Sequence, residues 1–181
     1  NGAIAWNIDD KGEIDDDYLL TGCSSITKSL ECGIAICQTL GHKSLEKEWR
    51  NAHGKLTKAI ENPAGIFDLK KDRSKFSMDS YYPILGGINS KKAASSFISN
   101  IKTTFWIEGL GIKCVADEPW VTVAETSECS IAFKKIGADE IALELLHNAI
   151  AIVDKSSIPY MGWQYIENIY WPEETPSWTS G

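Results

Sequence analysis

Apolar residues recur at helical spacing along most of the chain. Residues 21–40 carry apolar side chains three or four positions apart, which is the spacing of one helix face. These side chains are Ile26, Leu30, Ile34 and Cys37. Gly41 follows directly, and glycine favours the left-handed conformation in which many helices end. The pattern therefore predicts a helix over residues 21–40.

The same spacing predicts further helices. One covers residues 44–61 and ends at Asn62 and Pro63. Residues 79–88 and 90–101 form a pair that is interrupted at Gly86 and Gly87. Residues 120–136 and 138–153 form another pair, joined by Gly137. Alternating strand patterns are few, so we expect an all-α chain of helical hairpins separated by longer loops.

The long loops share an order of residues. Each presents glycine or an aromatic residue, then acidic residues, then a helix that opens on small or polar side chains. The expected helix starts near 21, 79, 122 and 179 lie 58, 43 and 57 residues apart, a degenerate repeat. Hairpins repeated in this way close into a ring. We predict an (α/α) toroid, with its cleft where the loops before the inner helices gather.

Composition and chain ends define the domain and its partners. The 181 residues fit one globular domain over 1–181, and the net charge of -7 disfavours nucleic acid and anionic membranes. No apolar run approaches the ~20 residues that span a bilayer. The chain begins at Asn1 rather than Met and stops at Gly181, just after Pro176 and Ser177, which are typical of a helix start. We therefore expect an incomplete, C-terminal portion of a longer toroid.

The cysteines and histidines indicate no metal centre. Five is an odd number of cysteines, and no Cys-x-x-Cys occurs, which favours free thiols in a reducing cytoplasm. The histidines lie at unrelated positions, so a zinc site or a Cys–His catalytic pair is the weaker alternative. We expect no metal and no cofactor. The residues concerned are Cys23, Cys32, Cys37, Cys114, Cys129, His42, His53 and His147.

Four long segments resemble a known family. They are EIDDDYLLTGCSSITKSLECGIAI, FSMDSYYPILGG, FWIEGLGIKCVADEPWVTVAETSECSIAF and YWPEETPSWTSG. Across nearly the whole chain they resemble uncharacterised bacterial proteins labelled prenyltransferase-like or "phenyltransferase". The resemblance implies an α/α toroid, in a longer chain, related to terpenoid cyclases, protein prenyltransferases and six-hairpin glycosidases. It implies no particular reaction, because one fold hosts many chemistries.

Two carboxylates are the candidates for catalysis. Glu125 lies one turn inside an expected buried helix, where a carboxylate is unfavourable unless it is paired or functional. Asp79 opens another expected helix beside Tyr81 and Tyr82, either as an N-cap or as a carboxylate in the cleft.

Aromatic and acidic residues in the loops are the candidates for substrate binding. Asp117 and Glu118, ahead of Pro119, fit a helix start equally well, because acidic residues are favoured at a helix N-terminus. The last loop fits a polar loop with an aromatic plug. The substrate-binding candidates are Tyr81, Tyr82, Asp117, Trp120, Trp171, Glu174 and Trp178.

Three functions fit these residues, and the first is carbohydrate binding or processing. Tyrosine and tryptophan rings stack on sugars, and a pair of carboxyls can hydrolyse a glycosidic bond. In this hypothesis Glu125 is the general acid and Asp79 its partner, while Trp120, Tyr82 and Trp178 are stacking platforms.

The second hypothesis is an isoprenoid transferase or cyclase, in keeping with the family label. The acidic motifs of those enzymes are incomplete, since the segment Glu13-Ile14-Asp15-Asp16 only approximates the Asp-x-Asp-Asp proton donor. The third hypothesis is a non-catalytic helical scaffold. A small molecule is the expected partner in the first two, and the oligomeric state stays open.

Overall fold

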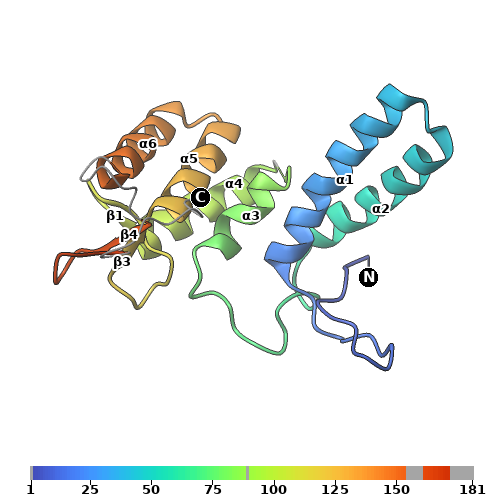
Figure 1. Ribbon diagram of the computed structural model, residues 1–181, viewed down its shortest axis with the longest axis horizontal. Helices are drawn as coiled ribbons and strands as arrows, with labels where there is room; N and C mark the ends of the chain where they lie inside the picture. Colours follow the sequence, from blue (N-terminus) through green and yellow to red (C-terminus); the bar gives the residue numbers. More distant parts are fainter. Residues whose placement is uncertain (1, 89, 154–160, 172–181) are drawn as a thin grey trace. The chain divides into compact units, whose positions relative to one another are not determined.

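The computed structural model describes residues 2–88, 90–153 and 161–171 (Figure 1). These residues belong to two compact units. One comprises Asn1–Arg73 and Tyr82–Ala93, and the other Ser74–Tyr81 and Ala94–Gly181. Each unit is built around a pair of packed helices.

The first unit contains the hairpin of α1 (Leu20–Leu40) and α2 (Lys43–Glu61), which confirms the helices predicted over 21–40 and 44–61. Gly41 ends α1 with φ of 74°, the left-handed conformation expected there. The apolar sides of the two helices meet in a core of Cys23, Leu56, Ala59, Ile60, Phe67 and Ile88.

The N-terminus of α1 is capped from a distant loop. The N-cap residue, Leu19, offers no side-chain hydrogen bond, and the Asp68 carboxylate instead accepts one from the backbone N–H of Leu20. Asp68 adopts a positive φ of 55°, and Arg73 lies 3.5 Å from its carboxylate. Burial raises the pKa of Asp68, although the Leu20 N–H and Arg73 both act to lower it.

The second unit contains α5 (Val123–Lys135) and α6 (Asp139–Val153), joined at Gly137 as the sequence predicts. The buried Ser130 hydroxyl donates to the Ala142 carbonyl at 2.6 Å and ties the two helices together. Aromatic rings fill the core beside α5, where the Phe97 and Phe133 centroids lie 4.6 Å apart.

Two shorter helices lie between these pairs in the sequence. They are α3 (Met78–Leu85) and α4 (Lys91–Asn100), and both end earlier than the predicted helices over 79–88 and 90–101. For α4 the difference is a single residue, since it ends at Asn100. Beyond Asn100, however, the backbone continues as a π-helical segment, η1 (Ile101–Phe105).

The chain is mostly helical, as predicted, but two small antiparallel sheets that the prediction lacks accompany the helices. One pairs β1 (Trp106–Ile107) with β2 (Gly111–Ile112). The other has the order β3 (Trp120–Thr122), β4 (Gly162–Gln164), β5 (Ile169–Trp171). The fold is therefore mostly helical with a minor strand component.

The helix predicted over 120–136 begins at Val123, three residues late. Its first residues form β3, in which Val121 pairs with Trp163 and Thr122 with Gly162. Strands of two or three residues are too short to show an alternating pattern, and the partner strand lies some forty positions along the chain. Local spacing therefore favours the wrong element.

Two helical hairpins, α1–α2 and α5–α6, are thus seen among the described residues (Figure 1). Closure of such hairpins into a toroid stays a prediction, as does the single domain over 1–181. Across the residues that the structure describes, no helix is both long enough and apolar enough to span a membrane.

Candidate functional site

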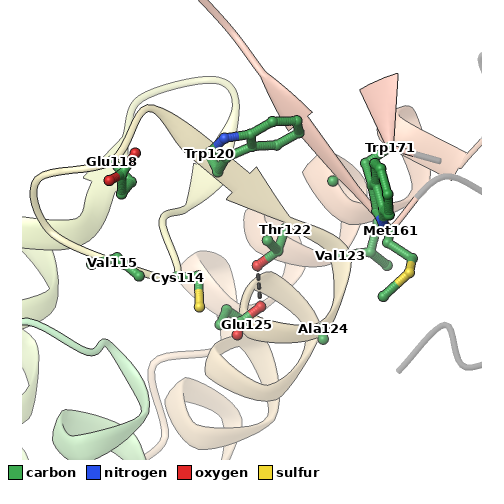
Figure 2. Close-up of a pocket in the computed structure, with 11 residues that line it drawn as sticks. Cys114, Val115, Glu118, Trp120, Thr122, Val123, Ala124, Glu125, Met161 and Trp171 are labelled. Atoms are coloured by element: carbon green, nitrogen blue, oxygen red, sulfur yellow. Dashed lines mark hydrogen bonds between the residues drawn. The ribbon is translucent and has the colours of Figure 1, made fainter. Parts of the chain in front are cut away.

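A cavity of about 550 Å³ lies in the second unit, where β3 runs into α5 (Figure 2). Its wall comes from the segment before β3, from β3 and the first turn of α5, and from the β4–β5 hairpin. Most of this wall is apolar, as in typical small-molecule sites. The apolar side chains are Val115, Trp120, Val123, Ala124, Met161 and Trp171.

Glu125 brings a buried carboxylate to this cavity. It stands in the first turn of α5 and is only 9% exposed. The Thr122 hydroxyl donates a hydrogen bond to Glu125 Oε2 (Figure 2). Thr122 is also the N-cap of α5, but its side chain makes no capping hydrogen bond.

Cys114 supplies a neutral thiol beside this carboxylate. Burial raises the pKa of Cys114 to about 12, and the hydrogen bond and charge of Glu125 act in the same direction. The thiol is therefore protonated at any physiological pH. Figure 2 shows the Cys114 and Thr122 side chains directed toward Glu125.

Two indoles form the aromatic part of the wall. Trp120 comes from β3, and Trp171 comes from the end of β5. Both lie above Glu125 in the view of Figure 2. Trp171 is 55% exposed, so a ligand that enters the cavity can cover its ring.

The backbone under the cavity is fixed by a close contact between β2 and α5. The Ile112 backbone N–H donates to Thr126 Oγ1 at 3.0 Å, and the same hydroxyl donates to the Thr122 carbonyl at 2.6 Å. Gly111 permits this approach, because a Cβ there would lie 2.7 Å from Thr126 Oγ1. Its φ of 135° is also a conformation that residues with side chains rarely adopt.

Three of the predicted site residues meet in this cavity, namely Glu125, Trp120 and Trp171. Asp117 lies exposed in the turn before β3, and its neighbour Glu118 lines the cavity. The helix start expected directly after Asp117 and Glu118 is wrong, since α5 begins only at Val123.

The remaining candidates lie elsewhere. Asp79 stands in the first turn of α3, as predicted, and is not part of the cavity wall. Tyr81 is completely buried, and its hydroxyl donates to Glu128 Oε2 at 2.7 Å. Tyr82 is half-buried in the first unit. Glu174 and Trp178 lie outside the described residues.

Sequence reasoning missed Cys114, Thr122 and Met161. A local signal exists only for Thr122, because Thr122-Val-Ala-Glu125 has the spacing of a helix capping box. Cys114 and Met161 reach the cavity through strand pairing, which leaves no local pattern. In the part of the chain that the structure describes, no group of three His, Cys, Asp or Glu side chains could hold a metal ion.

Comparison with known proteins gives one informative relative. No protein-family model matches the chain, so that comparison adds nothing to the prenyltransferase-like resemblance. A protein of Mycolicibacterium hassiacum named MMP endo-(1,4)-3-O-methyl-alpha-D-mannosidase is 37% identical over 178 residues. The alignment covers 98% of this chain and 48% of the relative, so the chain spans about half the length of that protein.

Proposed function

We propose that this chain forms the catalytic part of a glycoside hydrolase that cleaves (1,4)-linked α-mannosides, including 3-O-methylated ones. The observation that carries the proposal is the buried Glu125 carboxyl in a cavity walled by Trp120 and Trp171. The relative's name supports the same reaction class, and this chain aligns to it almost from end to end.

Glycoside hydrolysis uses two carboxyls, one of which protonates the leaving oxygen while the other activates water or attacks the sugar. We assign the general acid to Glu125. Its carboxyl is held by two neighbours, the Thr122 hydroxyl, which donates to Oε2, and the Cys114 thiol. Cys114 keeps its own proton and does not compete for that of the acid.

The second carboxyl has two candidates. Asp79 is the partner that the sequence predicts, and Glu118 shares the cavity wall with Glu125. The variants D79N and E118Q separate them, because only loss of the true partner lowers kcat by the factor of about 10²–10⁴ that acid–base catalysis contributes.

The apolar wall suits a methylated sugar. A methyl ether has no hydroxyl proton that needs a partner, and burial of its methyl group contributes about 0.8 kcal/mol. The side chains of Val123 and Met161 offer such a surface. A diphosphate, by contrast, needs cationic partners, and no Lys, Arg or His is among the described residues of this wall. The isoprenoid alternative is therefore not favoured.

The test is hydrolysis of (1,4)-linked oligosaccharides of 3-O-methyl-α-mannose by the protein that carries this chain. The reaction is measured as the release of new reducing ends. E125Q should lower kcat about 10³-fold, as expected for a general acid, while calorimetry still detects oligosaccharide binding. E108Q is the matched control, since Glu108 is exposed in the β1–β2 turn. Hydrolysis by E125Q at the rate of the unmodified protein would contradict the proposal, as would the absence of hydrolysis of any α-mannoside.

A further inference from the structure

The Thr122–Glu125 pair departs from the usual capping box. In that motif the threonine hydroxyl accepts from the backbone N–H of the third helical residue, and the glutamate accepts from the backbone N–H of the N-cap. Here the helix has the motif, but the Thr122 side chain makes no cap and donates to the Glu125 carboxylate instead. Helix α5 therefore lacks a stabilising side-chain cap, and the Thr122 hydroxyl binds the carboxylate in the cavity instead.

The backbone of Thr122 is well placed to hold a side chain still. Thr122 ends β3 opposite Gly162, and the next residue, Val123, donates its N–H to the Met161 carbonyl at 2.8 Å. The Thr122 carbonyl accepts from Thr126, whose hydroxyl also binds Ile112. Strand pairing and a buried hydroxyl thus fix the residue from two sides.

Hydrogen bonding must hold Glu125, because charge compensation is missing from the described wall. The titratable side chains that line the cavity with Glu125 are Cys114 and Glu118, neither of which is cationic. Glu118 is exposed to solvent, whereas Cys114 and Thr122 are directed toward Glu125 (Figure 2). The carboxylate is therefore held between Cys114, in the segment before β3, and Thr122, the last residue of β3.

We propose that Thr122 is the positioning residue of the site: its hydroxyl holds Glu125 in the cavity next to Cys114 and determines which carboxyl oxygen faces the substrate. The catalytic consequence rests on the proposed function, but the positioning itself does not. Removal of the hydroxyl leaves the Glu125 side chain able to rotate away from Cys114.

The Cys114 thiol provides a readout that needs no substrate. Alkylation requires the thiolate, whose fraction at a given pH depends on how close the Glu125 charge lies. In a C32S background, which removes the exposed cysteine, alkylation by N-ethylmaleimide at pH 9 is followed by mass spectrometry of the Cys114 peptide. T122V and T122A should raise the rate at least about threefold, in the direction of E125Q, and T122S should stay within about twofold of the unmodified protein.

Cys129 is the internal control for general loosening. Cys129 lies in α5, the helix that carries Glu125, and it is fully buried. Its alkylation rate therefore rises only if α5 opens. Faster alkylation of Cys114 with Cys129 unchanged supports the positioning role. If the alkylation rate of Cys114 is unchanged in both T122V and T122A, the positioning role is overturned. A parallel rise in the alkylation rate of Cys129 overturns it as well.

Kinetics distinguish this inference from the function it refines. T122V should lower kcat about tenfold with KM within about threefold, since a misplaced acid weakens the transition state more than substrate binding, and T122S should restore kcat. If E125Q is inactive and T122V has full activity, the positioning role fails while the proposed function stands. If E125Q is fully active, the proposed function fails, and the Cys114 rates alone decide the positioning role.

Discussion

Replacement of Gly111 by alanine tests whether the backbone beneath the cavity is as constrained as the contacts indicate. Gly111 has a φ of 135°, and an added Cβ would lie 2.7 Å from Thr126 Oγ1 and 3.0 Å from Val121 Cγ1. Neither neighbour can withdraw easily. Val121 is completely buried, and Thr126 is buried and binds the Ile112 N–H.

The magnitude follows from two contributions. A side chain in this region of φ costs about 1–3 kcal/mol of backbone strain. Displacement of the Thr126 hydroxyl leaves the buried Ile112 N–H without a partner, which costs about 1–3 kcal/mol more. We therefore expect G111A to lower the free energy of unfolding by about 4 kcal/mol, which for this chain length lowers Tm by about 8–16 °C.

Urea unfolding followed by circular dichroism measures this change, and G109A is the matched control. Gly109 also has a positive φ, of 73°, but an added Cβ there meets nothing within 4 Å. G109A should cost only about 1 kcal/mol. In a T126A background the clash with the hydroxyl is absent, so G111A should cost about 1–2 kcal/mol less than alone. Equal losses in G111A and G109A would refute the reasoning.

Three further outcomes are expected. W120A should weaken binding of the oligosaccharide in calorimetry by about 1–3 kcal/mol, the scale of a lost aromatic contact, whereas W6A, an exposed indole of the other unit, should leave it unchanged. Y81F should lower the free energy of unfolding in urea by about 1.5–3 kcal/mol, because its buried hydroxyl donates to a carboxylate at 2.7 Å. Lys70 lowers the pKa of Asp15 from its ordinary 3.8, so their ion pair stabilises the fold above that pH and is lost as the pH falls through the lower folded value. K70A should raise the pKa of Asp15 in an NMR titration of the carboxyl groups.

The helices were predictable because their signal is local. The apolar spacing and Gly41 fix the end of α1, and α2 stops where Asn62 precedes Pro63. The strands were not predictable, because Trp120 and Val121 are extended only through pairing with Gln164 and Trp163. Pairs so far apart in sequence leave no trace in local spacing.

The site could be predicted in part for the same reason. Glu125 was recognisable as a carboxylate among apolar neighbours on a helix, which is a local feature. The assignment of Glu118 to a helix start relied on a helix that begins later. Cys114 was beyond reach, since its place beside Glu125 depends on how the segment before β3 folds back onto α5.

The cavity forms only when β3 and β4 pair in their native register, so each molecule either contains the complete cavity or does not. Gly162 lines the cavity opposite Thr122, and the neighbouring Trp163 points to the other side, where its ring stacks on Tyr170. A shift of register by one residue moves every side chain to the opposite face and would bring the indole into the space above Glu125. Substitutions that weaken the β3–β4 pairing should therefore change the fraction of molecules able to bind ligand. A binding titration would then show a lower stoichiometry at an unchanged dissociation constant.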